Sequence, residues 1–325
     1  MRIVEAVRFG EPDVLVAREV TDLTAGPGEA VVGVAVTDVI YVETQIRSGW
    51  GRDYFTVEPP YVPGGAFTGH VLSVGADVDP GWVGRRVAAR TNAAGGGYAE
   101  QAVVAADALI AVPEELGLPE AAAVLTDGPT ALGLLDALPL RPGERVLILA
   151  AAGGMGTLLV QLAHAAGAYV IGAARGKAKL DLVRELGADA AVDYSLPDWT
   201  AQLGTVDLVL DGAGGSVGRA AFAITAPGGR FSAHGAPSGG FAPIEAAEAE
   251  TRGVALRGIA ELQFPPEEVR QLAERALAEA AAGRFRPVIG RSFPLERAAQ
   301  AHAAIEAREV LGKTLLEVRP AATVR

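Results

Sequence analysis

The chain has 325 residues and contains no cysteine. Disulfides, thiolate nucleophiles, iron–sulfur clusters and cysteine-ligated zinc are therefore excluded. No uncharged apolar run reaches the roughly 18–20 residues of a membrane-spanning helix, and the charged N-terminus lacks a secretory apolar segment. The net charge of −11, without a sustained basic stretch, argues against nucleic-acid or membrane partners. Because half of the residues are hydrophobic, we expect a cytoplasmic α/β enzyme with sizeable cores.

Glycine and proline clusters divide roughly the first 120 residues into short segments typical of strands. Four of these segments are EAVVGVAV (29–36), GHVLSVGA (69–76), GRRVAAR (84–90) and YAEQAVVAA (98–106). This rhythm predicts a β-rich, barrel-like domain.

From about Pro119 the pattern changes to strands that alternate with helices. The sequence predicts strands over 145–151, 168–174, 190–193, 206–213 and 229–236, and helices near 155–166, 177–186 and 215–225. This alternation indicates a parallel sheet with right-handed crossovers. After residue 260 the alternation stops, so we expect the tail to return to the first domain. The predicted domains are residues 1–121 with 263–325, and residues 122–262.

One turn carries a phosphate-binding pattern. Strand RVLILAA runs into Ala151-Ala152-Gly153-Gly154-Met155-Gly156 and then a helix, an A-x-G-x-x-G version of the dinucleotide fingerprint. Gly153 lets the backbone approach a pyrophosphate, and Gly156 lets the helix pack close to its strand. The amides at the helix start would then face the anion. The alternative is a tightly packed strand–turn–helix that binds nothing.

The end of the next predicted strand indicates which dinucleotide is bound. An NAD site places an acid there for the ribose 2′-hydroxyl. The segment Ile171–Lys179 has no acid but contains Arg175, Lys177 and Lys179, and the whole chain has only three lysines. Cations at a helix start oppose its dipole, whereas they pair well with a 2′-phosphate. The sequence therefore predicts NADPH as cofactor, the alternative being cations that only solvate the helix start.

Segments along nearly the whole chain resemble one family. They are ETQIRSG (43–49), VPGGAFTGHVLSVG (62–75), GGGYAE (95–100), the unit 146–193 and RPVIGRSFPLERAAQAH (286–302). In this order they are similar to the zinc-free medium-chain dehydrogenase/reductases, in the NADPH:quinone oxidoreductase and zeta-crystallin branch. The resemblance implies a GroES-like β-rich catalytic domain and a Rossmann domain, a doubly wound parallel sheet that binds NADPH. It also implies a homodimer joined through edge strands of the Rossmann sheet, near residues 254–259.

The resemblance further implies a set of cofactor contacts. It assigns a threonine near the nicotinamide ribose, the glycine turn at the pyrophosphate, two residues at the 2′-phosphate, backbone along the nicotinamide, and a lysine that approaches cofactor phosphate. The matching residues here are Thr130; Gly153, Gly154 and Met155; Lys177 and Tyr194; Gly235 with Leu262 to Phe264; and Lys313.

The resemblance also bears on metal. Zinc-bearing relatives use a cysteine and a Gly-His-Glu run, and the matching positions here are Ile40 and Gly64-Gly65-Ala66. We therefore expect no metal site. Hydride transfer without a Lewis acid favours acceptors that are already electron-poor, namely quinones and activated α,β-unsaturated carbonyls.

The substrate side departs from the family pattern G-V-N-P-V-D-T-Y-I-R-S-G. Ile40 replaces its asparagine and Gln45 its tyrosine, and Asp127 stands where the family has a neutral residue. The polar candidates on this side are Tyr41, Gln45, Asp127 and His234. Gln45 can bind a carbonyl but cannot titrate. Asp127 is either an acid with a raised pKa or a helix-capping carboxylate.

Three further observations bear on substrate binding. His234, after a predicted strand, is either a satisfied buried histidine or a ligand contact. His302 matches a family position that is structural. The aromatic residues Trp50, Tyr54 and Phe55 either stack on a flat substrate or pack a lid.

Together these features predict a metal-free, NADPH-dependent oxidoreductase that transfers hydride to a quinone or an activated α,β-unsaturated carbonyl. One alternative is a stand-alone enoyl reductase of the polyketide type, whose product enolate needs a proton. The other is an NADPH-binding protein with little catalysis and a crystallin-like or sensing role, which the departures at Ile40 and Gln45 motivate.

Overall fold

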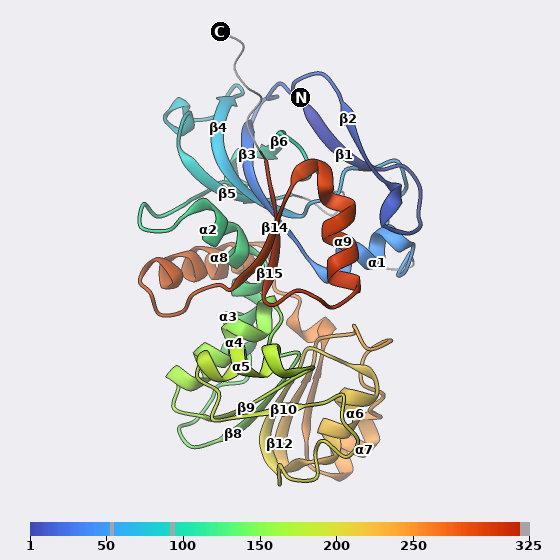
Figure 1. Ribbon diagram of the computed structural model, residues 1–325. Coiled ribbons are helices and arrows are strands. Elements are labelled where there is room, and N and C mark those ends of the chain that lie inside the picture. Colours follow the sequence, from blue (N-terminus) through green and yellow to red (C-terminus); the bar gives the residue numbers. More distant parts are fainter. Residues whose placement is uncertain (53–54, 92–94, 319–325) are drawn as a thin grey trace. The chain divides into compact units, whose positions relative to one another are not determined.

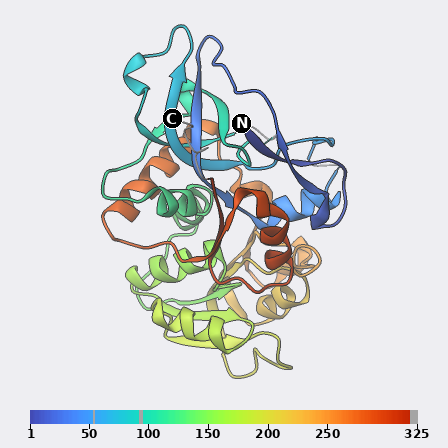
Figure 2. The same cartoon turned by 45° about the horizontal axis from the view of Figure 1, so that its top comes forward.

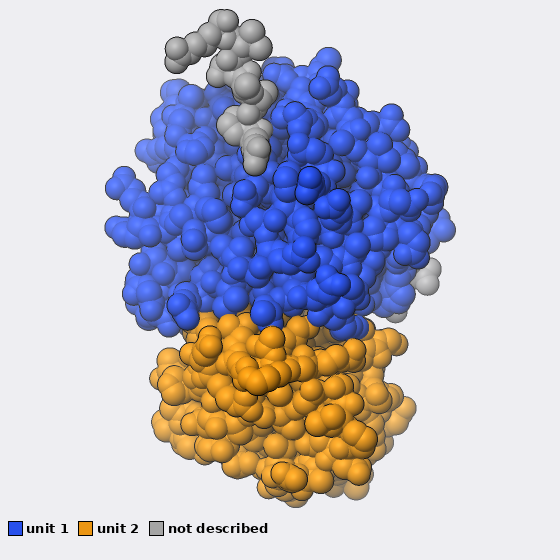
Figure 3. Space-filling view, viewed as in Figure 1, with its two compact units in different colours: residues 1–126, 273–325 blue, residues 127–272 orange. Residues whose placement is uncertain are grey.

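The computed structural model describes residues 1–52, 55–91 and 95–318 (Figure 1). Its backbone contacts divide the chain into two compact units, residues 1–126 with 273–325, and residues 127–272 (Figure 3). The boundaries predicted after residues 121 and 262 stay a prediction, because compactness alone does not show which segments fold independently.

The first unit is built on a seven-stranded sheet with the order β14-β15-β3-β4-β5-β7, in which β6 also pairs with β3. All pairs are antiparallel except β14 with β15. β15 from the C-terminal segment pairs with β3, so the tail adds two strands to the N-terminal sheet. A separate hairpin joins β1 to β2. The strand bounds are β1 Arg2–Ala6, β2 Leu15–Glu19, β3 Glu29–Val39, β4 Ala66–Val74, β5 Arg86–Arg90, β6 Gln101–Ala105, β7 Ile110–Ala111, β14 Ile289–Pro294 and β15 Lys313–Glu317.

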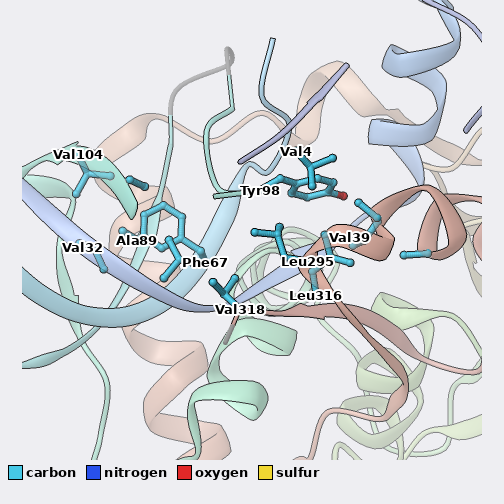
Figure 4. Packing of buried hydrophobic residues seen from close by; sticks show 14 of the residues in the cluster. Val4, Val32, Val39, Phe67, Ala89, Tyr98, Val104, Leu295, Leu316 and Val318 are labelled. Atoms are coloured by element: carbon cyan, nitrogen blue, oxygen red, sulfur yellow. The ribbon is translucent and has the colours of Figure 1, made fainter. Parts of the chain in front are cut away.

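A large apolar cluster packs against this sheet, as Figure 4 shows from close by. Alternate residues of the strands point inward, and Phe67 and Tyr98 are completely buried among valines and alanines. Helix α1 (Tyr41–Ser48) follows β3 directly and contacts α9 (Ala298–Glu306), as Figures 1 and 2 show. Helix α2 (Leu118–Leu125) packs on β4 and β3, and α8 (Pro266–Ala281) crosses the boundary between the units.

The second unit contains a six-stranded parallel sheet with the order β10-β9-β8-β11-β12-β13. In chain order this is 3-2-1-4-5-6, so the strand order reverses between β8 and β11. The strands are β8 Arg145–Leu149, β9 Tyr169–Ala174, β10 Ala190–Asp193, β11 Val206–Asp211, β12 Thr225–Ala233 and β13 Ala255–Gly258, and the helices are α3 Asp127–Ala137, α4 Gly154–Ala165, α5 Lys177–Glu185, α6 Gly215–Ala223 and α7 Ala246–Thr251.

The predicted strand–helix alternation is confirmed element by element in this unit. The apolar runs of β8 and β9 are almost entirely buried, as expected for strands covered on both faces. Helix α1 was not predicted from the sequence, because an eight-residue helix has too few turns to show a clear hydrophobic period. In the described part of the chain, every helix is too short or too polar to cross a bilayer.

Candidate cofactor and substrate site

The turn between β8 and α4 has the geometry of a phosphate cradle. Ala150 adopts a left-handed conformation with φ of 54°, an uncommon state for a residue with a side chain. Gly153 then caps α4, and its amide donates to the Ala150 carbonyl at 2.9 Å. A Cβ on Gly156 would lie 2.4 Å from that same carbonyl oxygen, so only glycine fits there. This close approach is the role that the fingerprint assigns to its last glycine.

Packing constrains Gly153 less than Gly156. Its φ of −82° suits any residue, and an added Cβ would come to 3.2 Å of one carbonyl oxygen, a close contact that only a small backbone shift relieves. The first intrahelical bond of α4 is Thr157 N–H to Gly153 C=O, so the amides of Gly154, Met155 and Gly156 precede the helical ladder. Gly153, which has no side chain, leaves room for a pyrophosphate. The first-turn amides and the positive end of the helix dipole would bind this anion.

The end of β9 presents the expected cations. Arg175 is exposed, and Lys177 begins α5, where its ammonium pairs with Asp181 one turn later. The sequence analysis missed Asp193, which the parallel register places beside this loop, because β10 pairs with β9 up to Ala174. Both of its oxygens are engaged, one by the Gly176 amide at 2.8 Å and the other by the amide and hydroxyl of Ser195.

The carboxylate of Asp193 therefore braces the loop instead of reaching outward. Although partial burial opposes it, hydrogen bonds from Ser195 and Gly176 and the charge of Arg175 hold its pKa below the usual range. Tyr194 follows directly and meets the ring of Trp199 edge-on, with centroids 6.4 Å apart. The two residues that the family resemblance assigns to the 2′-phosphate, Lys177 and Tyr194, thus lie after the ends of neighbouring strands.

The expected nicotinamide contacts lie after β12, on α3 and in the segment that follows β13. A Cβ on Gly235 would come within 2.2 Å of the Gly212 backbone, so the ends of β12 and β11 touch. Phe264 packs against α3, because a Cβ on Gly133 would lie 2.4 Å from its ring. Thr130 lies one turn before Gly133 on the same helix, and Leu262 is buried nearby in the unit.

A buried carboxylate that the sequence analysis passed over ends β11. Asp211 accepts the amides of Ala213 and Gly214 through Oδ1, while among the described residues Oδ2 has no hydrogen-bond partner. Burial raises the pKa of Asp211 to about 6. An aspartate directly before a glycine-rich segment is a signal for such a capped bend, and it was available from the sequence.

On the first unit, α1 carries the predicted substrate-side residues. Tyr41 and Gln45 are partly buried and lie four positions apart, hence on one face of the helix. The guanidinium of Arg308 stands 5.9 Å from the Tyr41 ring centroid. Trp50 is exposed beyond the helix, and Tyr54 lies outside the described residues.

Glu43, on the buried face of α1, is the centre of a polar network that sequence reasoning missed. Its carboxylate accepts three amides, those of Ile40, Gly64 and Gly65, each at 3.1 Å. It also accepts the Tyr98 hydroxyl at 3.0 Å. Glu43 therefore ties the start of α1 to the Gly64-Gly65 segment, the two places where zinc-bearing relatives have their ligands.

Burial dominates the electrostatics of this network. It raises the pKa of Glu43 to about 7, with a smaller contribution from the charge of Asp38, and it raises the pKa of Tyr98 well above its usual range. The Tyr98 hydroxyl also lies 3.0 Å from Nε2 of His302. Burial lowers the pKa of His302 to about 3, so its imidazole is neutral. This buried position agrees with the structural role expected for His302.

Two ion pairs complete the surroundings. Arg47, on α1, is completely buried and pairs with Glu306 on α9. Lys313 is also buried, and its ammonium lies 3.0 Å from the buried carboxylate of Asp38. The expected approach of Lys313 to cofactor phosphate would require it to leave this pair. We therefore omit Lys313 from the proposed cofactor contacts below.

The remaining predictions concern Asp127 and metal. Asp127 is the first residue of α3, where a carboxylate complements the helix dipole. Within the described ranges, no group of three or more histidine, aspartate and glutamate side chains is arranged to hold a metal ion.

The second unit has a doubly wound sheet with a phosphate cradle, and the first unit has a β-rich core. This combination of units defines the class of dinucleotide-dependent dehydrogenases and reductases. Comparison with known proteins gives the same class. Residues 26–114 match the alcohol dehydrogenase GroES-like domain, and residues 186–316 match the zinc-binding dehydrogenase model. The quinone oxidoreductase of Sus scrofa is 31% identical over 97% of both chains, and a 2-haloacrylate reductase of Burkholderia is 30% identical over 94% of this chain and 96% of its own.

Solved structures show the same relationship. The Escherichia coli quinone oxidoreductase in complex with NADPH superposes with a TM-score of 0.88, at 26% identity over 98% of this chain and all of that one. The chain belongs to the quinone oxidoreductase family of zinc-free medium-chain dehydrogenase/reductases, and it is an oxidoreductase. The predicted fold class, a GroES-like unit with a Rossmann unit, is confirmed.

Proposed function

We propose that this protein oxidises NADPH and transfers the hydride to a quinone or an activated α,β-unsaturated carbonyl. The observation that carries the proposal is the β8–α4 cradle, followed by the exposed cations after β9. NADPH is bound in the solved structure of the E. coli relative, which supports the same cofactor here. When bound, the dihydronicotinamide supplies the hydride, and the protein supplies orientation.

Each part of the cofactor has proposed partners. The amides of the α4 first turn bind the pyrophosphate, the side chains after β9 and β10 bind the 2′-phosphate, and residues of α3, β12 and the 262–264 segment line the nicotinamide. The proposed set is Gly153, Gly154, Met155 and Gly156; Arg175, Lys177 and Tyr194; and Thr130, Gly235, Leu262 and Phe264. On the substrate side, Tyr41 and Gln45 bind the acceptor oxygen, while Asp127 is the candidate acid.

The relatives support two acceptor classes. Several are quinone oxidoreductases, and a quinone can collect its protons from water after reduction. Another is a 2-haloacrylate reductase, whose name denotes an activated alkene as substrate. This relative favours alkene reduction as the second candidate, and that reaction needs a proton donor for the carbanion at the α-carbon.

The proposal is tested by NADPH oxidation with 1,4-benzoquinone, 9,10-phenanthrenequinone, a simple enone, 2-chloroacrylate and an enoyl thioester, with NADH in parallel. We expect turnover of a quinone or an activated alkene, with NADPH preferred. In the double variant Arg175→Ala/Lys177→Ala the KM for NADPH should rise at least tenfold and that for NADH little, because a charged pair with phosphate is lost. Failure to oxidise NADPH with any acceptor would refute the proposed activity, and equal effects on both cofactors would refute the assignment of these cations.

We further propose a cytoplasmic homodimer joined at β13. This strand ends the parallel sheet, and Phe241 and Ile259 are exposed large apolar residues beside a hollow that it lines. An unpaired edge next to apolar surface favours pairing with a second copy. Light scattering should give the mass of two chains for the wild type and of one chain for Ile259→Glu. A wild-type mass of one chain would contradict the dimer.

A further inference from the structure

His234 follows the last residue of β12, the strand next to β11, and its ring reaches toward the point between β11 and β8 where the strand order of the parallel sheet reverses. Its amide donates to the Asp211 carbonyl at 3.1 Å, which ties the end of β12 to the end of β11. A Cβ on Gly212 would stand 3.5 Å from His234 Nε2 and 3.6 Å from the Cβ of Ala150. The imidazole therefore leans over Gly212 toward the turn that leaves β8. In open parallel sheets this reversal point is where ligands bind.

The hydrogen bond on the other ring nitrogen sets the tautomer. Ser232 Oγ lies 3.0 Å from Nδ1, and Ser232 is completely buried. A buried hydroxyl must direct its hydrogen at an acceptor, since an unmade bond costs about 1–3 kcal/mol. In the described part of the chain Nδ1 is the acceptor that faces it. With Nδ1 accepting, the imidazole proton resides on Nε2, the atom over Gly212.

The ring is also neutral under ordinary conditions. Desolvation of the partly buried ring lowers the pKa of His234 to about 4, and it outweighs a hydrogen bond with the Ser232 backbone that raises the pKa. The carboxylate of Asp211, whose backbone carbonyl binds the His234 amide, directs Oδ1 at the amides of Ala213 and Gly214, and its Oδ2 faces Gly218. The Asp211 oxygens thus point at backbone amides and at α6 instead of holding a second proton on the ring. A neutral imidazole that is fixed in one tautomer donates through Nε2 across a wide pH range.

We propose that His234 donates its Nε2–H to a carbonyl oxygen of the ligand held at this reversal point. The inference rests on the proposed function, which supplies two such oxygens, the nicotinamide carboxamide and the carbonyl of the hydride acceptor. On the acceptor, the bond strengthens as negative charge develops on oxygen during hydride transfer. On the carboxamide, it fixes the orientation of the ring that gives the hydride.

Steady-state kinetics distinguish the two oxygens. The variants are His234→Phe, which removes the donor; His234→Gln, which keeps an N–H; and His164→Gln, an exposed control on α4. We expect His234→Phe to lose about tenfold in kcat/KM, the value of one neutral hydrogen bond, and His234→Gln to recover most of it. A rise in the KM for NADPH, with or without a fall in kcat, assigns the carboxamide. A rise in the acceptor KM, or a fall in kcat with the KM for NADPH unchanged, assigns the acceptor. Unchanged constants in the phenylalanine variant would overturn the proposal.

Nitrogen chemical shifts of the imidazole test the tautomer without catalysis. The chain has four histidines, so each ring is assigned from a single variant. We expect His234 to carry its proton on Nε2, to stay neutral down to pH 5, and to shift when NADPH or NADP⁺ with a quinone is added. The variant Ser232→Ala should mix the tautomers and lower kcat/KM, whereas a merely structural serine would leave the ring unchanged. A protonated Nδ1, or no shift with either ligand, would overturn the inference.

These outcomes separate the inference from the proposed function. If the wild type binds NADPH and reduces an acceptor while the His234 variants behave normally, only the role of His234 is lost. If the wild type itself neither binds nor oxidises NADPH, the proposed function has failed.

Discussion

The stability of the first unit should depend on pH through Glu43. Its pKa is about 7 in the folded chain, against 4.5 for the free side chain, because burial disfavours the carboxylate. The folded protein therefore holds this proton more tightly than the unfolded chain does. The contribution is present at low pH and is lost as pH rises from about 4.5 to 7. A difference of 2.5 pKa units corresponds to roughly 3 kcal/mol in the alkaline limit.

Most of this change falls in an accessible range. With the two pKa values above, the free energy of unfolding should fall by roughly 2–3 kcal/mol between pH 5 and pH 8 through Glu43 alone. The variant Glu43→Gln has no proton to lose and keeps an oxygen for the amides of Gly64 and Gly65. The difference in unfolding free energy between wild type and variant should therefore shift by roughly 2–3 kcal/mol toward the variant over this range.

The tryptophans allow the first unit to be followed by itself. The chain has three, of which Trp50 and Trp82 lie in the first unit and Trp199 in the second. In a Trp199→Phe background, urea unfolding monitored by fluorescence reports the first unit at pH 5, 6.5 and 8. His302 titrates with the opposite sign, but it is present in both proteins and cancels in the difference. The exposed carboxylate variant Glu114→Gln serves as control. A difference that stays constant with pH would refute the reasoning.

Two further predictions concern the glycines of the β8–α4 turn and the buried Lys313–Asp38 ion pair. Gly156→Ala should lower the melting temperature of the second unit strongly, because its Cβ would lie 2.4 Å from backbone, whereas Gly153→Ala, with a contact of 3.2 Å, should lower it less and weaken NADPH binding about tenfold. Equal effects of the two variants on both readouts would contradict the separation of roles. Lys313→Met should lower the free energy of unfolding by roughly 3–5 kcal/mol, because it leaves the buried charge of Asp38 unpaired, and the double variant Asp38→Asn/Lys313→Met should recover much of this loss. Urea unfolding measures the stability of both variants, and additive losses from the two substitutions would exclude the coupling.

The parallel unit was predictable because its signals are local. Each strand is a short apolar run, each crossover helix follows within a few residues, and the glycine turn lies between β8 and α4. The same holds for the cations at Arg175 and Lys177, which were identified from one nine-residue segment. Asp193 was missed for the converse reason. It reaches the Gly176 amide only because β10 lies beside β9 in a particular register.

The polar network of the first unit could not be predicted from spacing. Glu43 and Tyr98 are 55 positions apart, and Tyr98 and His302 are 204 apart. Nothing in the local pattern distinguishes a glutamate that binds three amides from one that faces water. Its neighbour Gln45 was found because it interrupts a family pattern, and Tyr41 was found as a polar residue in the same segment. Glu43 was not singled out, because it keeps an acid in that pattern.

The network bears on whether the changes at Ile40 and Gln45 mark a different acceptor or a loss of catalysis. Burying polar groups such as the carboxyl of Glu43 and the guanidinium of Arg47 costs more free energy than burying apolar residues of similar size would. Here the two buried side chains fix α1 in place. Glu43 accepts the Ile40 amide at the start of the helix, and Arg47 pairs with Glu306 on α9. A helix fixed in this way presents Tyr41 and Gln45 in a defined orientation, which a protein without an acceptor would not require. The architecture therefore supports catalysis on an altered acceptor over an inactive NADPH-binding protein.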